Sequence, residues 1–250
     1  PSAVKRPLPD PRNVIFETGR SRAFDRMVIL CDFDDTAADR NVATLLLDAF
    51  PKGPFTQTSP RWRDLHSQYL NAEITLAEYQ EHAFTGMPAS RERQAAYARE
   101  HASLRPGFRE LAGYCAVNDI ELAIVSHGLD FYVQALLEAA DLGHLPVFAV
   151  ETSDSEAGGT TFAYPFARDE CAWAPGNCKC SIVEEYRERG HRVLYAGDGL
   201  SDTCPAKQAD FVFARDGLLQ FCEAHDLPHR ELIDFNVILD YLEEVGPEGA

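Results

Sequence analysis

Four short polar segments of the sequence carry side chains that could together perform phosphoryl transfer. Three of them follow apolar runs: DFDDT follows MVILC, SHG follows ELAIV, and GDGLSD follows RVLYA. The fourth, KCS, follows a cysteine-containing loop, and its lysine is one of only four in the 250-residue chain. The candidate catalytic and metal-binding side chains in these segments are Asp32, Asp34, Ser126, Lys179, Asp198 and Asp202.

The chemistry of phosphoryl transfer requires groups of these kinds. The reaction needs a nucleophile, a proton donor for the leaving oxygen, a hard cation, and positive charge near the phosphoryl oxygens. Asp32 and Asp34 are separated by one residue. One of the two carboxylates can attack phosphorus while the other transfers protons. Asp198 adds a carboxylate from another strand, which gives an oxygen-rich site of the kind that Mg²⁺ prefers. The hydroxyl of Ser126 and the ammonium of Lys179 can hold and neutralise the phosphoryl oxygens.

The hydrophobic pattern predicts how these segments are brought together. Short apolar runs predict strands over residues 27–31, 121–125, 147–150, 192–196 and 211–214. Helices are predicted over residues 42–50, 108–117, 131–140 and 181–189, with further helices at the C-terminal end. This alternation predicts an α/β fold with a doubly wound, mainly parallel sheet. In such a sheet the active site forms at the carboxyl ends of the strands, where the candidate residues lie.

One segment interrupts this alternation of strands and helices. Between residues 51 and 104 the sequence favours helices only, and the stretches ITLAEYQEHAF and RERQAAYAREHA lie within it. We therefore predict a small all-helical cap at residues 51–104, inserted after the first strand of a catalytic core formed by residues 26–50 and 105–250. Residues 1–25 are polar and rich in proline, and we interpret them as an N-terminal arm.

The composition excludes several classes of partner. With 40 acidic and 23 basic residues the net charge is −17, which argues against nucleic-acid binding because that affinity depends on lysine and arginine. No apolar run reaches the roughly 18 residues that a membrane helix needs. Prolines stand where a signal peptide would need an apolar segment. We expect a cytoplasmic protein with a small-molecule partner, and the sequence predicts no oligomeric state.

The seven cysteines allow two interpretations. Their odd number, without an evenly spaced framework, favours reduced thiols. Cys171, Cys178 and Cys180 lie close together in the sequence and leave a zinc site open as an alternative. Their spacing, C-x6-C-x-C, differs from the paired C-x2-C arrangement of structural zinc sites, so the reduced interpretation is preferred.

Taken together, the four segments resemble the motifs of a known superfamily. DFDDT, the serine after the next apolar strand, a lysine, and GDGLSD, in this order, are similar to the motifs of haloacid dehalogenase (HAD) superfamily phosphatases of subclass I. SHGLDFYVQALLE and SDTCPAKQADFVFARDGLL resemble one branch, which contains the methionine-salvage 2-hydroxy-3-keto-5-methylthiopentenyl-1-phosphate phosphatases and the phosphoethanolamine/phosphocholine phosphatases. The resemblance covers residues 27–245. It implies a Rossmann-like core with a cap, Mg²⁺ as cofactor, and an aspartyl-phosphate intermediate.

The resemblance also implies a role for each candidate residue. Asp32 would be the nucleophile, and Asp34 the general acid that later acts as base. Ser126 and Lys179 would bind the phosphoryl group. The metal ligands would be the Asp32 carboxylate, the Asp34 backbone carbonyl and Asp198, with support from Asp202.

Substrate choice is expected to depend on residues beside the motifs, namely Asp39, Arg40, His127 and Gly128. The phosphoethanolamine enzymes carry an aspartate at the position of His127, and the methionine-salvage enzymes a glycine. An imidazole offers a hydrogen bond to a substrate oxygen but no fixed negative charge to an amine. We therefore expect a phosphatase for a sugar-like or keto metabolite phosphate. A phosphoethanolamine/phosphocholine phosphatase and a phosphotransferase that uses the same phospho-aspartate are the alternatives.

Overall fold

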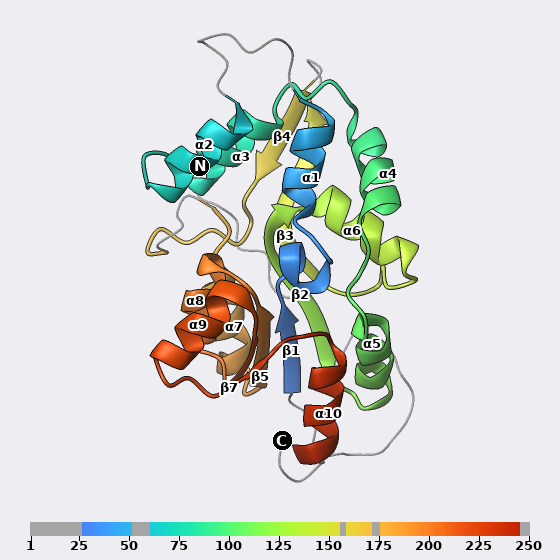
Figure 1. Cartoon of the computed structure of the whole chain (residues 1–250), viewed down its shortest axis with the longest axis vertical. Coiled ribbons are helices and arrows are strands. Elements are labelled where there is room, and N and C mark those ends of the chain that lie inside the picture. The colour runs from blue at the N-terminus through green and yellow to red at the C-terminus, as the bar shows by residue number, and fades with distance from the viewer. Residues whose placement is uncertain (1–26, 52–60, 156–158, 172–175, 246–250) are drawn as a thin grey trace.

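A seven-stranded sheet forms the centre of the computed structural model (Figure 1), which describes residues 27–51, 61–155, 159–171 and 176–245. The strands are ordered β4-β3-β2-β1-β5-β6-β7, and every neighbouring pair is parallel except β3 and β4. Their bounds are β1 (Met27–Cys31), β2 (Glu121–Leu129), β3 (Val147–Ser155), β4 (Gly159–Ala163), β5 (Arg192–Gly197), β6 (Phe211–Ala214) and β7 (His229–Glu231). The predicted α/β class with a mainly parallel sheet is confirmed. The predicted arm at residues 1–25 lies outside the described residues.

Strand β1 lies in the middle of the sheet because both of its faces are apolar. All five of its residues are buried. Side chains alternate between the two faces of a strand, so Ile29 and Cys31 pack into one core while Val28 and Leu30 pack into the other. A continuous apolar run is therefore required here, and it fixes the position from which Asp32 leaves the sheet.

Helices cover both faces of this sheet. Helices α1 (Val42–Ala49), α5 (Phe108–Val117), α6 (Asp130–Ala139) and α10 (Asn236–Val245) supply apolar side chains to the core that contains Ile29. Helix α7 (Lys179–Glu188) covers the opposite face, and α8 (Thr203–Ala206) and α9 (Asp216–Ala224) pack beside β6 (Figure 1). None of the described helices is long and apolar enough to cross a membrane.

The sheet is larger than the sequence predicts. Strand β2 continues past residue 125 to Leu129, and β3 continues past residue 150 to Ser155. The extension of β3 pairs with β4, an antiparallel edge strand whose residues are only half-buried or exposed. Strand β7 has only three residues, HRE, and pairs with β6. Neither edge strand was predicted, because backbone pairing rather than an apolar pattern defines them.

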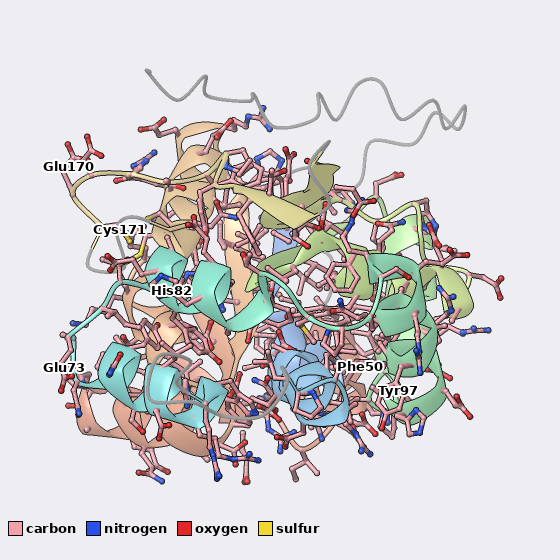
Figure 2. All side chains as sticks on the ribbon, turned by 90° about the horizontal axis from the view of Figure 1, so that it is seen from above. Phe50, Glu73, His82, Tyr97, Glu170 and Cys171 are labelled. Atoms are coloured by element: carbon pink, nitrogen blue, oxygen red, sulfur yellow. A yellow bond between two sulfur atoms is a disulfide. The ribbon has the colours of Figure 1, made fainter. Side chains whose placement is uncertain are left out.

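The regular elements described between residues 61 and 101 of the inserted segment are all helices. It contains α2 (Trp62–Leu70), α3 (Leu76–Phe84) and α4 (Arg91–His101). Helices α2 and α3 pack on each other, with the Tyr69 and Tyr79 rings stacked at 5.6 Å. Helix α4 instead packs against α6 and α1, and Figure 2 shows its Tyr97 beside Phe50, with ring centroids 5.2 Å apart. The boundaries of a cap at residues 51–104 stay a prediction.

The sequence favours reduced thiols for all seven cysteines, and this prediction is wrong for two of them. Cys180 in the first turn of α7 and Cys204 in α8 form a disulfide, with Cα atoms 6.1 Å apart. The two helices lie side by side although 24 residues separate the cysteines in the sequence, and this Cα distance lies within the range that a disulfide spans. Because its sulfur is bonded to Cys204, Cys180 is not available as a ligand for the zinc site that the sequence left open. Figure 2 shows Cys171 at the edge of the molecule, on the loop that leads to α7.

Candidate active site

The carboxyl ends of β1, β2 and β5 meet at a cavity of about 270 Å³ that α2 and α3 cover. The loops after these strands and the start of α7 therefore supply one wall, and the inserted helices supply another. The sequence-predicted residues that line the cavity are Asp32, Asp34, Ser126, His127, Gly128, Lys179 and Asp198.

Lys179 lies at the first turn of α7 and connects the first and fourth motifs. Its ammonium donates hydrogen bonds to Asp32 Oδ1 at 2.6 Å and to Asp202 Oδ1 at 2.7 Å. Only 3% of the Lys179 surface is exposed. Burial alone would lower the pKa of Lys179, but the charges of Asp202 and Asp32 outweigh it and hold the pKa above its ordinary value. The lysine is therefore charged where it faces the cavity.

Asp202 is fully buried and accepts four hydrogen bonds. Its Oδ1 accepts from Lys179 and, at 2.6 Å, from the Tyr195 hydroxyl. Its Oδ2 accepts from the backbone N–H groups of Asp198 at 3.1 Å and Gly199 at 3.0 Å. Although burial opposes ionisation, the charge of Lys179 and these donors lower the pKa of Asp202. With both oxygens engaged, Asp202 is suited to hold the lysine and the fourth-motif loop in place.

This ion-pair network predicts a large stability effect at Asp202. Asp202→Asn keeps the shape of the side chain but removes a charge opposite Lys179, and it puts an amide N–H₂ group in place of an oxygen that accepts two hydrogen bonds. Buried donors would then face donors, and losing one partner of a buried pair costs about 3–5 kcal/mol. We expect the free energy of unfolding in urea to fall by that amount. Glu244→Gln is the control, because Glu244 pairs with Arg230 at the surface, where such pairs contribute at most about 1 kcal/mol. Equal losses in the two variants would contradict the role of the network.

Three carboxylates close to the cavity form a group that fits a divalent cation. Oxygens of Asp32, Asp198 and Asp202 lie within 4.8 Å of one another. Thr36 donates to Asp198 Oδ1 at 2.9 Å. Burial and the neighbouring Asp202 raise the pKa of Asp198 to about 6, since Lys179 alone does not balance three negative charges. Hard oxygen donors with excess negative charge are the set that Mg²⁺ prefers.

Asp34 lies in a tight turn over Phe33–Ala37 and is held by two donors. The Tyr132 hydroxyl donates to Asp34 Oδ2 at 2.7 Å, and the backbone N–H of Val42 donates to Oδ1 at 2.7 Å. Burial raises the pKa of Asp34 to about 7, against the lowering effect of the Tyr132 hydrogen bond. A carboxyl group with a pKa near neutrality can both give and take a proton, as a general acid–base must.

Gly128 is required by the close approach of Asp34 and Tyr132 to its backbone. A Cβ atom at this position would lie 2.2 Å from the Tyr132 hydroxyl and 2.7 Å from Asp34 Oδ2. The backbone N–H of Gly128 also donates to Ser126 Oγ at 2.9 Å, which orients the serine hydroxyl beside the cavity. The SHG segment therefore positions both the hydroxyl of Ser126 and the carboxyl of Asp34.

A single methyl group at this glycine should reduce turnover. Gly128→Ala pushes apart the Asp34–Tyr132 pair, and a displacement of about 1 Å in a catalytic group can cost about 100-fold in rate. We expect a fall of that order in kcat for phosphate release, with a folded protein by circular dichroism. Gly113→Ala in α5 is the matched control, since its new Cβ would meet nothing within 4 Å. Wild-type kcat in Gly128→Ala would contradict this account.

His127 follows Ser126 and lines the cavity, but it is a neutral group. Burial and the charge of Lys179 lower the pKa of His127 to about 3, and its ring hydrogen-bonds the backbone of Asn177. A hydrogen bond from this imidazole to the substrate stays a prediction.

The structure does not bring Asp39 and Arg40 to the cavity. The Asp39 carboxylate accepts from the backbone N–H and the hydroxyl of Ser103, both at 3.1 Å. These contacts join the chain leaving the core to the chain returning to it, where Ala38 also pairs with Leu104. Half of the Arg40 side chain is exposed beside Asp39. Both residues therefore serve the connection between core and insert.

Several residues of the site carry no recognisable signal in the sequence. Tyr132 and Tyr195 belong to a helix and a strand whose apolar patterns account for them fully. Arg105 donates to the backbone oxygens of Asp35 at 2.9 Å and Thr36 at 3.0 Å, and so holds the first-motif turn. Only Thr36, which completes DFDDT, could have been found from the motif.

Comparisons with known proteins agree with this geometry. The chain is 32% identical over 225 residues to the 2-hydroxy-3-keto-5-methylthiopentenyl-1-phosphate phosphatase of Brevibacillus brevis. The aligned region covers 89% of this chain and 98% of that protein. A HAD family hydrolase from Salmonella enterica subsp. enterica serovar Typhi is 16% identical, with a TM-score of 0.63 over 85% of this chain and 69% of that one. Phosphoserine phosphatase from T. onnurineus is 16% identical, with a TM-score of 0.59 over 90% and 98% of the two chains.

The two solved structures establish the HAD fold, and the sequence relatives establish the enzyme class, a phosphoric monoester hydrolase. The model of one family matches residues 27–237, which include all four motif segments. The chain belongs to the family described as "Putative Phosphatase".

Proposed function

We propose that this enzyme hydrolyses a small metabolite phosphomonoester in a Mg²⁺-dependent reaction through an aspartyl-phosphate on Asp32. The observation that carries the proposal is the pairing of two differently held carboxyl groups. Asp32 is bound to the Lys179 ammonium, whereas Asp34 is bound to the Tyr132 hydroxyl and has a pKa of about 7. Burial raises the pKa of Asp32, the charge of Lys179 opposes this, and Asp202 and Asp198 add to the rise. Lys179 is therefore the group that favours an ionised nucleophile at Asp32, whereas the pKa of Asp34 suits a proton donor.

The reaction would proceed in two displacements. In the first, an Asp32 carboxylate oxygen bonds to phosphorus, the ester P–O bond breaks, and Asp34 gives its proton to the leaving alkoxide. In the second, Asp34 takes a proton from water, the water oxygen bonds to phosphorus, and the bond to Asp32 breaks. Lys179 and Ser126 bind phosphoryl oxygens in both steps. Side chains of α2 and α3 line the cavity and would reduce the access of bulk water to the reacting groups.

The cation would be held by the Asp32 carboxylate, the Asp34 backbone carbonyl and Asp198. When bound, it supplies positive charge to the phosphoryl oxygens. Asp202 supports this group through Lys179 and the fourth-motif loop rather than as a ligand, because four donors engage its oxygens.

The cavity favours a leaving group without charge. Of the described residues that line it, Lys179 is the only lysine or arginine, so a substrate carboxylate would meet no second cation there. Helices α2 and α3 contribute no acidic residue to the lining, so an amine or quaternary ammonium would meet no carboxylate on that wall. They contribute mainly aromatic and apolar side chains, together with His66 and Gln80. A hydroxylated or keto metabolite phosphate fits this lining, and the name of the Brevibacillus brevis relative describes such a compound.

A screen of phosphate release over a panel of phosphomonoesters tests the proposal. The panel should contain neutral hydroxylated and keto compounds, phosphoserine, phosphoethanolamine and phosphocholine. We expect the highest kcat/KM for a neutral compound. A clear preference for phosphoethanolamine or phosphocholine would overturn the substrate class. Transfer of the phosphoryl group to an added alcohol, in place of water, would make the enzyme a phosphotransferase.

A further inference from the structure

We propose that Gln80 determines substrate specificity, and that its side-chain oxygen accepts a hydrogen bond from a hydroxyl group near the phosphorylated carbon of the substrate. This inference rests on the proposed phosphatase function and names a feature of its substrate. Gln80 lies in α3, lines the cavity and contacts the SHG segment through the His127 carbonyl.

The orientation of the Gln80 amide follows from its neighbour. Its Nε2 donates a hydrogen bond to the backbone carbonyl of His127. A carbonyl oxygen can only accept, so the amide nitrogen must be on that side and Oε1 must be on the other. The assignment of oxygen and nitrogen, which is ambiguous for many glutamines, is therefore determined here by the hydrogen bond.

The Gln80 oxygen needs a donor that the described part of the protein does not provide. Only 5% of the residue surface is exposed, and Oε1 is buried without a hydrogen-bond partner among the described residues. Buried polar atoms are nearly always satisfied, so an unsatisfied acceptor at the wall of a cavity indicates a donor on the molecule that enters it. Because Oε1 can only accept, it selects an O–H or N–H group and gives nothing to a keto or ether oxygen at the same place.

The position of Gln80 indicates which part of the substrate it contacts. Its partner, the His127 carbonyl, belongs to the residue after Ser126, which the proposed mechanism assigns to the phosphoryl group. The donor must therefore lie close to the ester oxygen rather than at the far end of the leaving group. Other side chains of this wall, such as Leu76, Tyr79 and Phe84, offer mainly apolar surface. A neutral leaving group with a hydroxyl close to the phosphorylated carbon satisfies both conditions.

Two substrates and two variants test this inference. Propane-1,2-diol 1-phosphate and propyl phosphate differ only in the hydroxyl group, and the measured quantity is the ratio of their kcat/KM values. Gln80→Met keeps an unbranched side chain of similar length but removes the acceptor. Gln94→Met is the matched control, because Gln94 is also buried, donates through Nε2 to a backbone carbonyl and has an unpartnered Oε1, but does not line the cavity.

We expect wild type to prefer the diol phosphate and Gln80→Met to reduce that ratio about tenfold, the effect of one hydrogen bond. Gln94→Met should leave the ratio unchanged. A Gln80→Met variant that slows both substrates equally would overturn the inference and leave the phosphatase intact. Absence of phosphate release from these two compounds and from every compound of the panel above with wild-type enzyme would instead overturn the proposed function.

Discussion

Asp32→Asn is expected to lower phosphate release by about 10³-fold or more. The amide has nearly the shape of the carboxylate, but its oxygen is not a competent nucleophile, so no phosphoryl-enzyme can form. The fold should survive, because Lys179 keeps its second partner, Asp202, at 2.7 Å. The measurement is kcat in a phosphate-release assay, with thermal unfolding to show that the variant is folded.

The same chemical change at an exposed aspartate provides the control. Asp141 is 90% exposed at its side chain, follows α6 and does not line the cavity. Asp141→Asn should therefore retain wild-type kcat. Asp32→Asn with more than a few per cent of wild-type activity would rule out Asp32 as the nucleophile.

Removal of divalent cations is expected to abolish activity, and Mg²⁺ should restore it. Three carboxylates lie within 4.8 Å of one another and face the single positive charge of Lys179, so the group carries a net negative charge that a hard cation would balance. The same repulsion predicts that Mg²⁺ raises the melting temperature of the chelated protein, since a ligand that binds the native state stabilises it.

Two measurements check this prediction independently. Phosphate release is measured after exhaustive treatment with EDTA and again after addition of Mg²⁺. The melting temperature is measured on the same samples without substrate, and Asp198→Asn should reduce the Mg²⁺-dependent rise. Full activity of the chelated enzyme would exclude the metal-dependent mechanism. If Mg²⁺ raises the melting temperature of Asp198→Asn as much as that of wild type, the cation binds at another site.

The sequence by itself determined the central strands and the order of the motif loops. A buried central strand must be apolar on both faces, so MVILC indicates β1 at its observed bounds, and the polar residues after it must leave the sheet at its carboxyl end. The same reasoning predicted the alternation of helices and strands, because hydrophobic periodicity is a local property of the chain. The scarcity of lysine drew attention to Lys179, which the structure places 2.6 Å from Asp32.

Only the tertiary structure decided which side chains meet across the site. Tyr132 contacts Asp34 across 98 residues of sequence, and Gln80 contacts His127 across 47. Tyr132 lies in α6 and Gln80 in α3, and each fits the pattern of its helix, so no local feature of the sequence distinguishes either from a core residue. Asp39 shows the reverse case, since it follows the first motif directly but turns to Ser103 and away from the cavity. Proximity in sequence places a residue on a loop, whereas the direction of its side chain depends on the elements that pack beside that loop.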